Sequence, residues 1–470
     1  MSEFSFDFLP LDNAGSVFPG QNSALWSNVF RLSVDIGREV DHDVLRRALT
    51  ATLERIPSMR VRMRYGFFCN YLEPNREECP LREDIANFCY RVSFRENNGY
   101  LFRVYYRSSR ISVDFYHALC DGHSGTVFVL TLAGEYLRLA GESISSNRFV
   151  LDTKEKPKPE EAEDAYLRYC GDDDKASLTD PRVYHKKGTP LPAHSCNYTT
   201  VFIDFDKLHS VSKSLGVTVT EFFAAILMEI HYRKQLEKGK MKKPVSVQIP
   251  VNLRSFFPSD TLRNFVLCVL VRLDKRDREY TFEEILQRVS SQLRSVNNKK
   301  AHQAYITRTV ILGARLLRFV PVRIKNLFTK IGFAFGAEYS TTALLSNLGP
   351  VPLTDDMNPH IRSLSFYTGP GLVNGARCGV ACVGNRLAFT FSNRYEEDDV
   401  ERAFLQKLCS LGIEATVEAN RDTGFGDIDG VTDAENAYSD MAFIPPKSTG
   451  SRLKKYDMTP RERLRRYFYF

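Results

Sequence analysis

Apolar and polar positions alternate regularly along the first third of the chain. In residues 29–36 every second side chain, from Phe30 onward, is apolar, which predicts a strand with one buried face. Residues 45–56 carry apolar side chains at helical spacing, and Pro57 ends the predicted helix. The pattern then predicts strands at 100–107 and 111–117 and a helix at 124–139 closed by Gly141. This order of elements is typical of a mixed α/β lobe.

A second α/β region follows a change in composition. Residues 151–195 are charged, contain several prolines and lack periodicity, as expected of a linker or crossover. Beyond it the pattern predicts helices at 206–215, 219–236 and 281–296 and strands at 198–204, 244–251, 265–273, 341–346, 361–368, 376–383 and 386–392. The apolar run 265–273 is typical of a central strand. We therefore predict an N-terminal lobe at 1–150, the linker at 151–195, a C-terminal lobe at 196–418 and a polar, flexible tail at 419–470.

Composition narrows the class of protein. The 470 residues are 43% hydrophobic, enough for a large core, and no run approaches the roughly 18 apolar residues of a membrane helix. The first residues lack the basic region of a signal peptide. The ten cysteines form no CxxC pairs of the kind that bind zinc, so we predict no metal site. Free cysteines in apolar runs favour a reducing, cytoplasmic location.

The charge of the chain is concentrated at its end. Residues 451–470 hold seven basic and two acidic residues, so they account for +5 of the formal charge of +7. The nearly neutral remainder argues against a nucleic-acid partner. The last four residues, 467–470, are all aromatic. A solvated end is one interpretation of this tail, and peripheral contact with an anionic membrane or a partner protein is the other.

The sharpest chemical signal is the segment His117-Ala-Leu-Cys-Asp121-Gly122. Its histidine lies at the end of a predicted strand, where catalytic side chains are often displayed, and an imidazole suits proton removal near neutral pH. An Asp-Gly pair can turn the chain before the next helix. His123 begins that helix, so we expect it to cap or support the site rather than to act as the base. A satisfied core histidine is the alternative for His117.

This segment resembles the HxxxDG active-site motif of the chloramphenicol acetyltransferase-like superfamily, which includes alcohol acetyltransferases and nonribosomal peptide condensation domains. Residues 9–20 (LPLDNAGSVFPG) and 250–265 (PVNLRSFFPSDTLRNF) are similar to bacterial alcohol-acetyltransferase-like members. The resemblance covers roughly residues 5–415. It implies an α/β fold of two lobes, each an α+β sandwich, with an active-site tunnel between them.

The resemblance also implies roles for single residues. His117 would deprotonate the acceptor, while Asp121 would point away and pair with Arg254. Gly122 would allow a tight turn. Ser346 would complete the catalytic set with His117 and Asp121 by donating to the oxyanion, with Asn347 supporting it. The alternatives are a turn-forming Asp121, a solvated Arg254 and an ordinary Ser-Asn turn after a strand.

The acyl donor and the acyl acceptor are predicted less directly than the site residues. Tyr116 replaces the extra histidine that condensation domains carry before the catalytic one, the plant-type DFGWG motif is absent, and the chain includes no carrier-protein domain. We therefore expect an acyltransferase with acyl-CoA as co-substrate, no permanently bound cofactor, and a small-molecule or lipid acceptor bearing a hydroxyl or amine. No residues are assigned to coenzyme A. The alternatives are a condensation-like enzyme served by a separate acyl carrier protein, and a non-catalytic binding relative. Two complete lobes in one chain favour a monomer.

Overall fold

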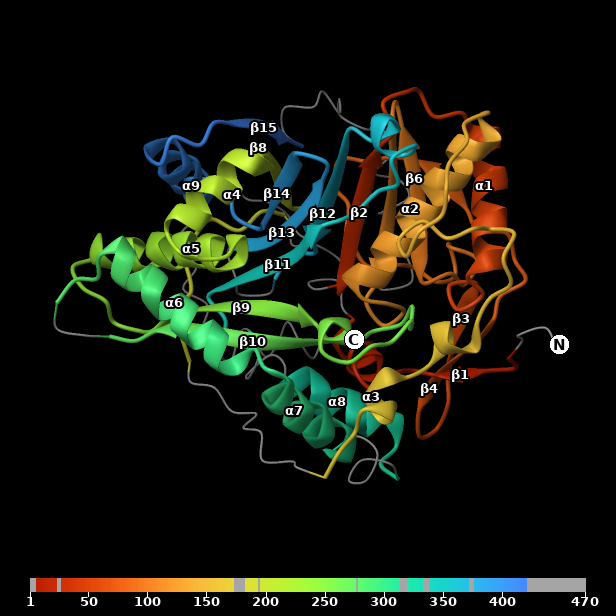
Figure 1. Ribbon diagram of the computed structural model, residues 1–470. Coiled ribbons are helices and arrows are strands. Elements are labelled where there is room, and N and C mark those ends of the chain that lie inside the picture. Colours follow the sequence, from red (N-terminus) through yellow and green to blue (C-terminus); the bar gives the residue numbers. More distant parts are fainter. Residues whose placement is uncertain are drawn as a thin grey trace, which may run out of the picture. The chain divides into compact units, whose positions relative to one another are not determined.

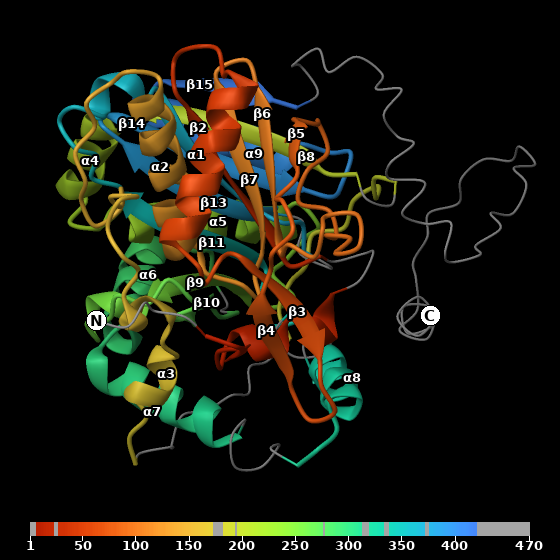
Figure 2. The same ribbon diagram turned by 90° about the vertical axis from the view of Figure 1, so that its right-hand side faces the viewer.

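Three β-sheets and the helices packed on them make up the structure, a computed structural model (Figures 1 and 2). It describes residues 6–22, 27–172, 182–192, 195–275, 278–312, 319–332, 338–371 and 376–420. Met1–Gly424 form one compact unit, and everything below concerns its described part. Most of the predicted tail, from residue 421 onward, lies outside the described residues.

The N-terminal lobe is built on a five-stranded sheet. Its strand order is β12-β2-β7-β6-β5, antiparallel except for the β5–β6 pair. The bounds are β2 Val29–Asp35, β5 Leu81–Glu83, β6 Phe102–Arg107, β7 Arg110–Tyr116 and β12 Ser363–Thr368. The strands predicted at 29–36, 100–107 and 111–117 are β2, β6 and β7. β12 comes from far along the chain, so residues of the predicted C-terminal region complete this sheet.

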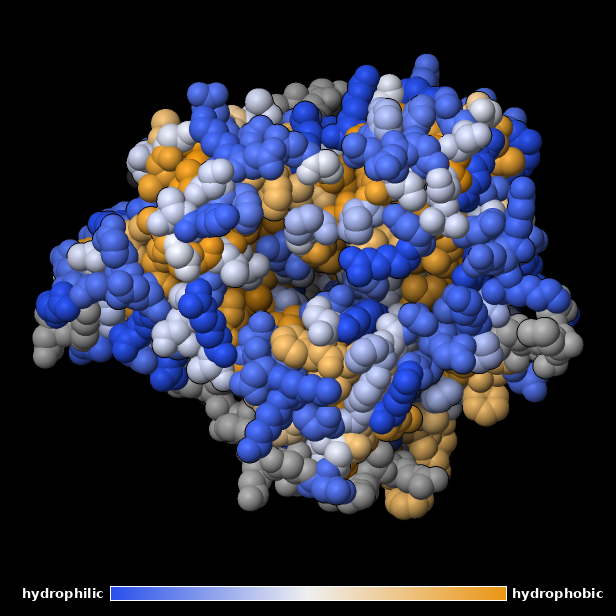
Figure 3. All heavy atoms as spheres, in the orientation of Figure 1, coloured by the Kyte–Doolittle hydropathy of each residue, from blue (hydrophilic) through white to orange (hydrophobic). Residues whose placement is uncertain are grey.

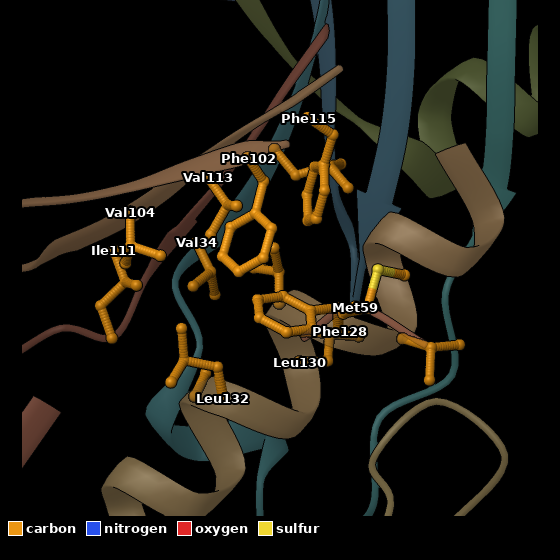
Figure 4. Close-up of a cluster of buried hydrophobic side chains, with 14 of the residues drawn as sticks. Val34, Met59, Phe102, Val104, Ile111, Val113, Phe115, Phe128, Leu130 and Leu132 are labelled. Carbon is orange, nitrogen blue, oxygen red and sulfur yellow. The ribbon is translucent and has the colours of Figure 1, made fainter. Parts of the chain in front are cut away.

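Two helices cover one face of this sheet. They are α1 His42–Arg55, capped by the Asp41 carboxylate, and α2 Gly122–Leu139. Phe102 and Phe115 of the sheet meet Phe128 of α2 edge to face, with ring centroids 5.1 and 5.7 Å apart (Figure 4). Such buried aromatic contacts anchor α2, and with it the chain that enters α2 from β7.

A small antiparallel sheet extends from the N-terminal lobe. Its order is β1-β4-β3, with β1 Leu9–Pro10, β3 Val61–Tyr65 and β4 Asn70–Pro74. The hairpin between β3 and β4 was not predicted, because its tip, 66–69, holds two phenylalanines where a turn normally carries polar residues.

The C-terminal lobe is built on a seven-stranded mixed sheet. Its order is β10-β9-β11-β13-β14-β8-β15. The bounds are β8 Asn197–Asp204, β9 Val245–Asn252, β10 Val266–Leu273, β11 Ala343–Pro350, β13 Ala376–Val383, β14 Arg386–Asn393 and β15 Ala415–Ala419. The helices of this region are α4 Phe205–Ser214, α5 Val219–Leu236, α6 Phe282–Val296, α7 Lys299–Ile311, α8 Val322–Gly332 and α9 Asp399–Ser410. α5 and α6 pack on β9–β11, and Thr281 caps α6 with Glu284 in the predicted capping box.

One strand prediction was wrong in its position. The apolar run that forms β10 lies at the edge of the sheet, not in its centre. One face of β10 packs against α6, while Cys268 and Leu270 on the other face line a cavity. One face is therefore buried and the other borders the cavity, with Cys268 exposed there, so apolar side chains occur on both faces of this edge strand.

The predicted linker makes specific contacts where it is described. It contains α3, Ala165–Arg168, and Glu161 forms a buried two-bond ion pair with Arg55 at 2.7 and 2.8 Å. The Tyr166 hydroxyl accepts from Val266 N at 2.9 Å. Residues 173–181 and 193–194 of this segment lie outside the described residues.

Within the described ranges no single helix is long and apolar enough to cross a bilayer; α4 and α5, bent by 79° at their junction, reach that length and composition only as a pair.

Candidate active site

His117 directly follows strand β7 in the strand–loop–helix context that was predicted. Its backbone N–H donates to Asn28 O at 2.9 Å, which holds the end of β7 against the chain before β2. Four residues later Asp121 caps α2. The histidine is therefore fixed between two rigid elements, which hold its side chain in place.

The tautomer of His117 is set by two residues from distant segments. Nδ1 lies 3.0 Å from Asn264 Oδ1, and Asn264 Nδ2 donates to Asp12 Oδ2 at 3.1 Å. A carboxylate only accepts hydrogen bonds, so Asp12 takes the amide N–H of Asn264 and turns its carbonyl oxygen toward the histidine. Nδ1 must then carry the proton, and Nε2 is left with the lone pair.

Aromatic rings enclose the imidazole. Phe18 stacks on it at 4.5 Å between centroids with an interplanar angle of 19°, and Phe30 meets it at 5.3 Å in an edge contact. Burial lowers the pKa of His117 below its ordinary value of 6.5, because the charged imidazolium loses hydration. The neutral, proton-accepting form therefore prevails at neutral pH.

Asp121 and Arg254 form the predicted pair. Arg254 Nη1 donates to Asp121 Oδ2 at 2.8 Å, and both side chains are nearly inaccessible, at 8% and 4% exposure. The carboxylate also accepts from Ser124 N at 2.9 Å and Phe265 N at 2.8 Å. Burial pushes the pKa of Asp121 upward, but Arg254 and these donors outweigh it and lower the pKa to about 2.

The two residues after Asp121 differ from expectation in detail. The φ of Gly122 is not in the left-handed region, so no turn requires glycine there. A Cβ at this position would instead lie 3.0 Å from Leu348 Cδ2 and 3.3 Å from Phe366 Cζ, so a larger residue would make these side chains shift. His123 packs edge-on against Phe149 and does not cap α2, since the cap is Asp121.

Ser346 and Asn347 lie on β11 and point differently. Ser346 pairs in register with Gly379 and lines the same cavity as His117; its hydroxyl makes no hydrogen bond to the described residues. Asn347 Nδ2 donates to Thr220 Oγ1 at 2.9 Å, and its Oδ1 accepts from Gly349 N at 2.7 Å. Asn347 thus ties β11 to the start of α5, while Ser346 keeps a donor available to a bound molecule.

A cavity of about 1380 Å³ joins these groups. Its walls come from both lobes: Phe30, His117 and Phe366 from one, and Gln248, Cys268 and Ser346 from the other. Figure 3 shows the surface hollowed near the centre of the face it presents. Pockets for one small ligand usually measure about 300–1,000 Å³, so this cavity has room for two molecules at once.

Sequence reasoning missed Asp12, Asn264 and Phe18 as site residues. All three lie in the segments 9–20 and 250–265 whose similarity to the superfamily was noted, yet nothing in their spacing links them to His117. The structure buries both Asp12 and Asn264 completely, and the sequence carries no signal of that burial beyond the similarity of their segments.

Comparisons with known proteins show which solved structures share this fold. No protein-family model matches the chain, and no curated protein sequence does. TRI101 of F. sporotrichioides, crystallised with coenzyme A and T-2, has a TM-score of 0.58 at 12% identity, over 88% of this chain and 100% of that chain. Polyketide synthase associated protein 5 from Mycobacterium tuberculosis has a TM-score of 0.54 at 15% identity, over 86% and 98%.

The starter condensation domain of rhizomide synthetase RzmA, in complex with C8-CoA and Leu-SNAC, also matches. Its TM-score is 0.54 at 13% identity, over 86% of this chain and 94% of that chain. Likeness at such identity establishes the fold alone. This chain has the mixed α/β fold of condensation domains and of TRI101, in agreement with the α/β fold class that the HxxxDG resemblance implied.

Proposed function

We propose that this chain transfers an acyl group from a coenzyme A thioester to a hydroxyl or amine, with His117 Nε2 as general base. The observation that carries the proposal is the Asp12–Asn264–His117 chain of hydrogen bonds, which ends at an unprotonated nitrogen in a two-lobed cavity. Neighbours of the same fold were crystallised with coenzyme A or C8-CoA, which supports the donor class.

The reaction proceeds by proton transfer and addition. Nε2 of His117 takes the acceptor's proton as its oxygen or nitrogen bonds to the thioester carbonyl carbon. The resulting oxyanion accepts a hydrogen bond from the Ser346 hydroxyl. Collapse of this intermediate breaks the C–S bond, and the imidazolium returns the proton to the leaving thiolate. Asp121 takes no part in proton transfer, because its oxygens are occupied by Arg254, Ser124 and Phe265.

Thiol release is the direct test. Purified protein is mixed with acetyl-CoA and longer acyl-CoAs, with and without a panel of alcohols and amines, beside His117→Ala and Ser346→Ala. We expect acceptor-dependent release that His117→Ala abolishes and that Ser346→Ala reduces by about 10²–10³-fold, as for other single oxyanion donors.

Other outcomes of this experiment would indicate a different function for the chain. Release only from acyl groups loaded on a separate carrier protein would identify a condensation-like enzyme. Absence of release with either donor would contradict catalysis and favour a binding module that retains the fold.

A further inference from the structure

Helix α8 turns its apolar side outward. Ile324, Leu327 and Phe328, which share one helical face, are 45%, 44% and 65% exposed. A helix on a protein surface normally buries such a stripe against the core. Packing within the described chain therefore does not account for these residues.

The opposite side of α8 is the one that packs. It lies on the 3-10 turn η2, Pro19–Gln21, where a Cβ on Gly20 would come within 2.8 Å of the Asn326 backbone. The polar side chains Asn326 and Thr329 face inward and line the cavity. The amphipathic helix is thus docked with its polar face inside, so its apolar face is left for a ligand or partner.

The tip of the β3–β4 hairpin continues this apolar face. Phe67 and Phe68 are 71% and 45% exposed and meet edge to face at 4.7 Å. Val322 N donates to Phe67 O, and Lys325 Nζ donates to Phe68 O, both at 2.8 Å. Figure 2 shows α8 beside the tip, and Figure 3 shows hydrophobic atoms protruding at the lower right, where the hairpin lies. We call α8 and residues 66–69 the α8–hairpin surface.

The charge of this surface has one sign. α8 contains Arg323, Lys325 and Lys330 and no acidic residue. Of these, Arg323 is exposed, whereas Lys325 bonds Phe68 O beside the cavity and Lys330 is half-buried. In the hairpin, Arg62 and Arg64 share the carboxylate of Glu73, so the excess positive charge comes from α8. Aromatic and aliphatic side chains beside cations are typical of surfaces that enter the headgroup region of an anionic bilayer.

The α8–hairpin surface also borders the cavity. Phe68, Val322 and Lys325 belong to the same cavity wall as His117. A molecule that leaves a bilayer beneath α8 could therefore enter the cavity that His117 lines.

We propose that the α8–hairpin surface docks on anionic lipid bilayers and delivers a bilayer-dissolved, hydroxyl-bearing acceptor to the cavity. The second half of this inference rests on the proposed acyl transfer, while the docking itself does not. Insertion of protruding phenylalanines requires no complementary pocket, and the exposed Arg323 beside them matches a diffuse anionic surface.

Vesicle flotation tests the docking without any activity. Full-length protein is mixed with vesicles of phosphatidylcholine, with or without phosphatidylserine. We expect binding to the anionic vesicles that salt weakens. The double variant Phe67→Ser/Phe328→Ser should bind at least about tenfold more weakly, because each phenylalanine contributes by burying apolar area. Arg323→Gln should weaken binding about fivefold.

The matched control is Leu215→Ser, at the end of α4, where the leucine is 39% exposed. It should bind like the wild type, and unchanged melting temperatures should show that all variants fold. Failure of the wild type to bind anionic vesicles, or unchanged binding by the double variant, would overturn the proposal. So would a concentration-dependent dimer that the double variant abolishes, because the surface would then be a self-association face.

Thiol release separates the two proposals. With a water-soluble alcohol and no vesicles, the double variant should match the wild type. With a long-chain alcohol embedded in anionic vesicles it should be slower by the same factor as its loss of binding. Release in solution without vesicle binding would refute docking alone, whereas vesicle binding without any release would refute the proposed function alone.

Discussion

Two buried carboxylates, Asp12 and Asp121, both accept hydrogen bonds from the segment Asn252–Phe265. The two hydrogen-bond networks that result differ in whether they leave an atom unbonded. Asp121 meets Arg254 and the backbone of Phe265, and every group in that cluster is bonded to another. Asp12 meets Asn264, and the chain of bonds that starts there ends at a histidine nitrogen in the cavity.

The comparison shows how one motif supplies both a fully bonded carboxylate and a histidine with one unused nitrogen. Arg254 also donates to Thr261 O at 2.8 Å and Arg263 O at 2.8 Å, so it fastens its loop as well as Asp121. The hydrogen-bonding groups of that cluster are bonded to one another and are not available to a substrate. His117 is held equally firmly on one nitrogen, and the other nitrogen has no partner among the described residues. The proposed mechanism depends on this one unused lone pair in an otherwise satisfied network.

The largest effect should come from removing that lone pair. His117→Gln keeps an amide of similar size but no base, so turnover should fall by about 10²–10⁴-fold. The melting temperature should change little, because His117 contributes no buried charge pair. Steady-state thiol release measures the turnover, and thermal unfolding measures the melting temperature. A large loss of stability with activity retained would show that His117 has a structural role and not a catalytic one.

The saturated cluster should respond in the opposite way. Arg254→Met leaves the Asp121 carboxylate buried without its partner, which should lower the free energy of unfolding by about 3–5 kcal/mol. Urea denaturation at neutral pH measures this. The pKa of Asp121, lowered to about 2, means that its pairing stabilises the fold above its ordinary pKa and is lost as the pH falls toward 2. The gap between wild type and variant should therefore shrink in acid.

Asn264→Ala should reduce activity less than His117→Gln does. It frees Nδ1 of His117, so the imidazole loses both its tautomer preference and its orientation. Activity should fall about 10–100-fold, as when residues that orient a histidine are removed elsewhere. Asp12→Asn is the sharper companion, since an amide at position 12 permits Asn264 to flip and offer an N–H to Nδ1. An unchanged rate in both variants would exclude the hydrogen-bond chain from catalysis.

The smallest effect concerns pH. Burial lowers the pKa of His117, so kcat/KM should not yet decline as the pH falls through 6.5. The decline should begin only at a lower pH, where His117 becomes protonated. Asp164 lines the same cavity, and burial together with the nearby Asp12 raises its pKa to about 6. Asp164→Asn distinguishes the two groups: the acid limb should persist in this variant if it belongs to His117.

Much of the secondary structure could be predicted because it depends on local patterns. α5 spans Val219–Leu236 and β14 spans Arg386–Asn393, within a residue of the ranges that periodicity predicts. The β3–β4 hairpin and α8 could not, because their exposed aromatics and outward apolar stripe reverse the usual relation between hydrophobicity and burial. Pairing of β12 with β2 depends on contacts more than 300 residues apart along the chain, which no local pattern encodes.

The sequence by itself predicted that His117 follows a strand and that Asp121 precedes a helix, and it suggested Arg254 and Ser346 as candidates for the same site. Local spacing and turn chemistry suffice for the first two, and the superfamily resemblance supplies the others. Only the tertiary structure decided which nitrogen of His117 is free, because that depends on Asp12 and Asn264 meeting across 252 residues of chain. It also decided which side of α8 faces solvent, since the direction of an amphipathic helix is set by what it packs against.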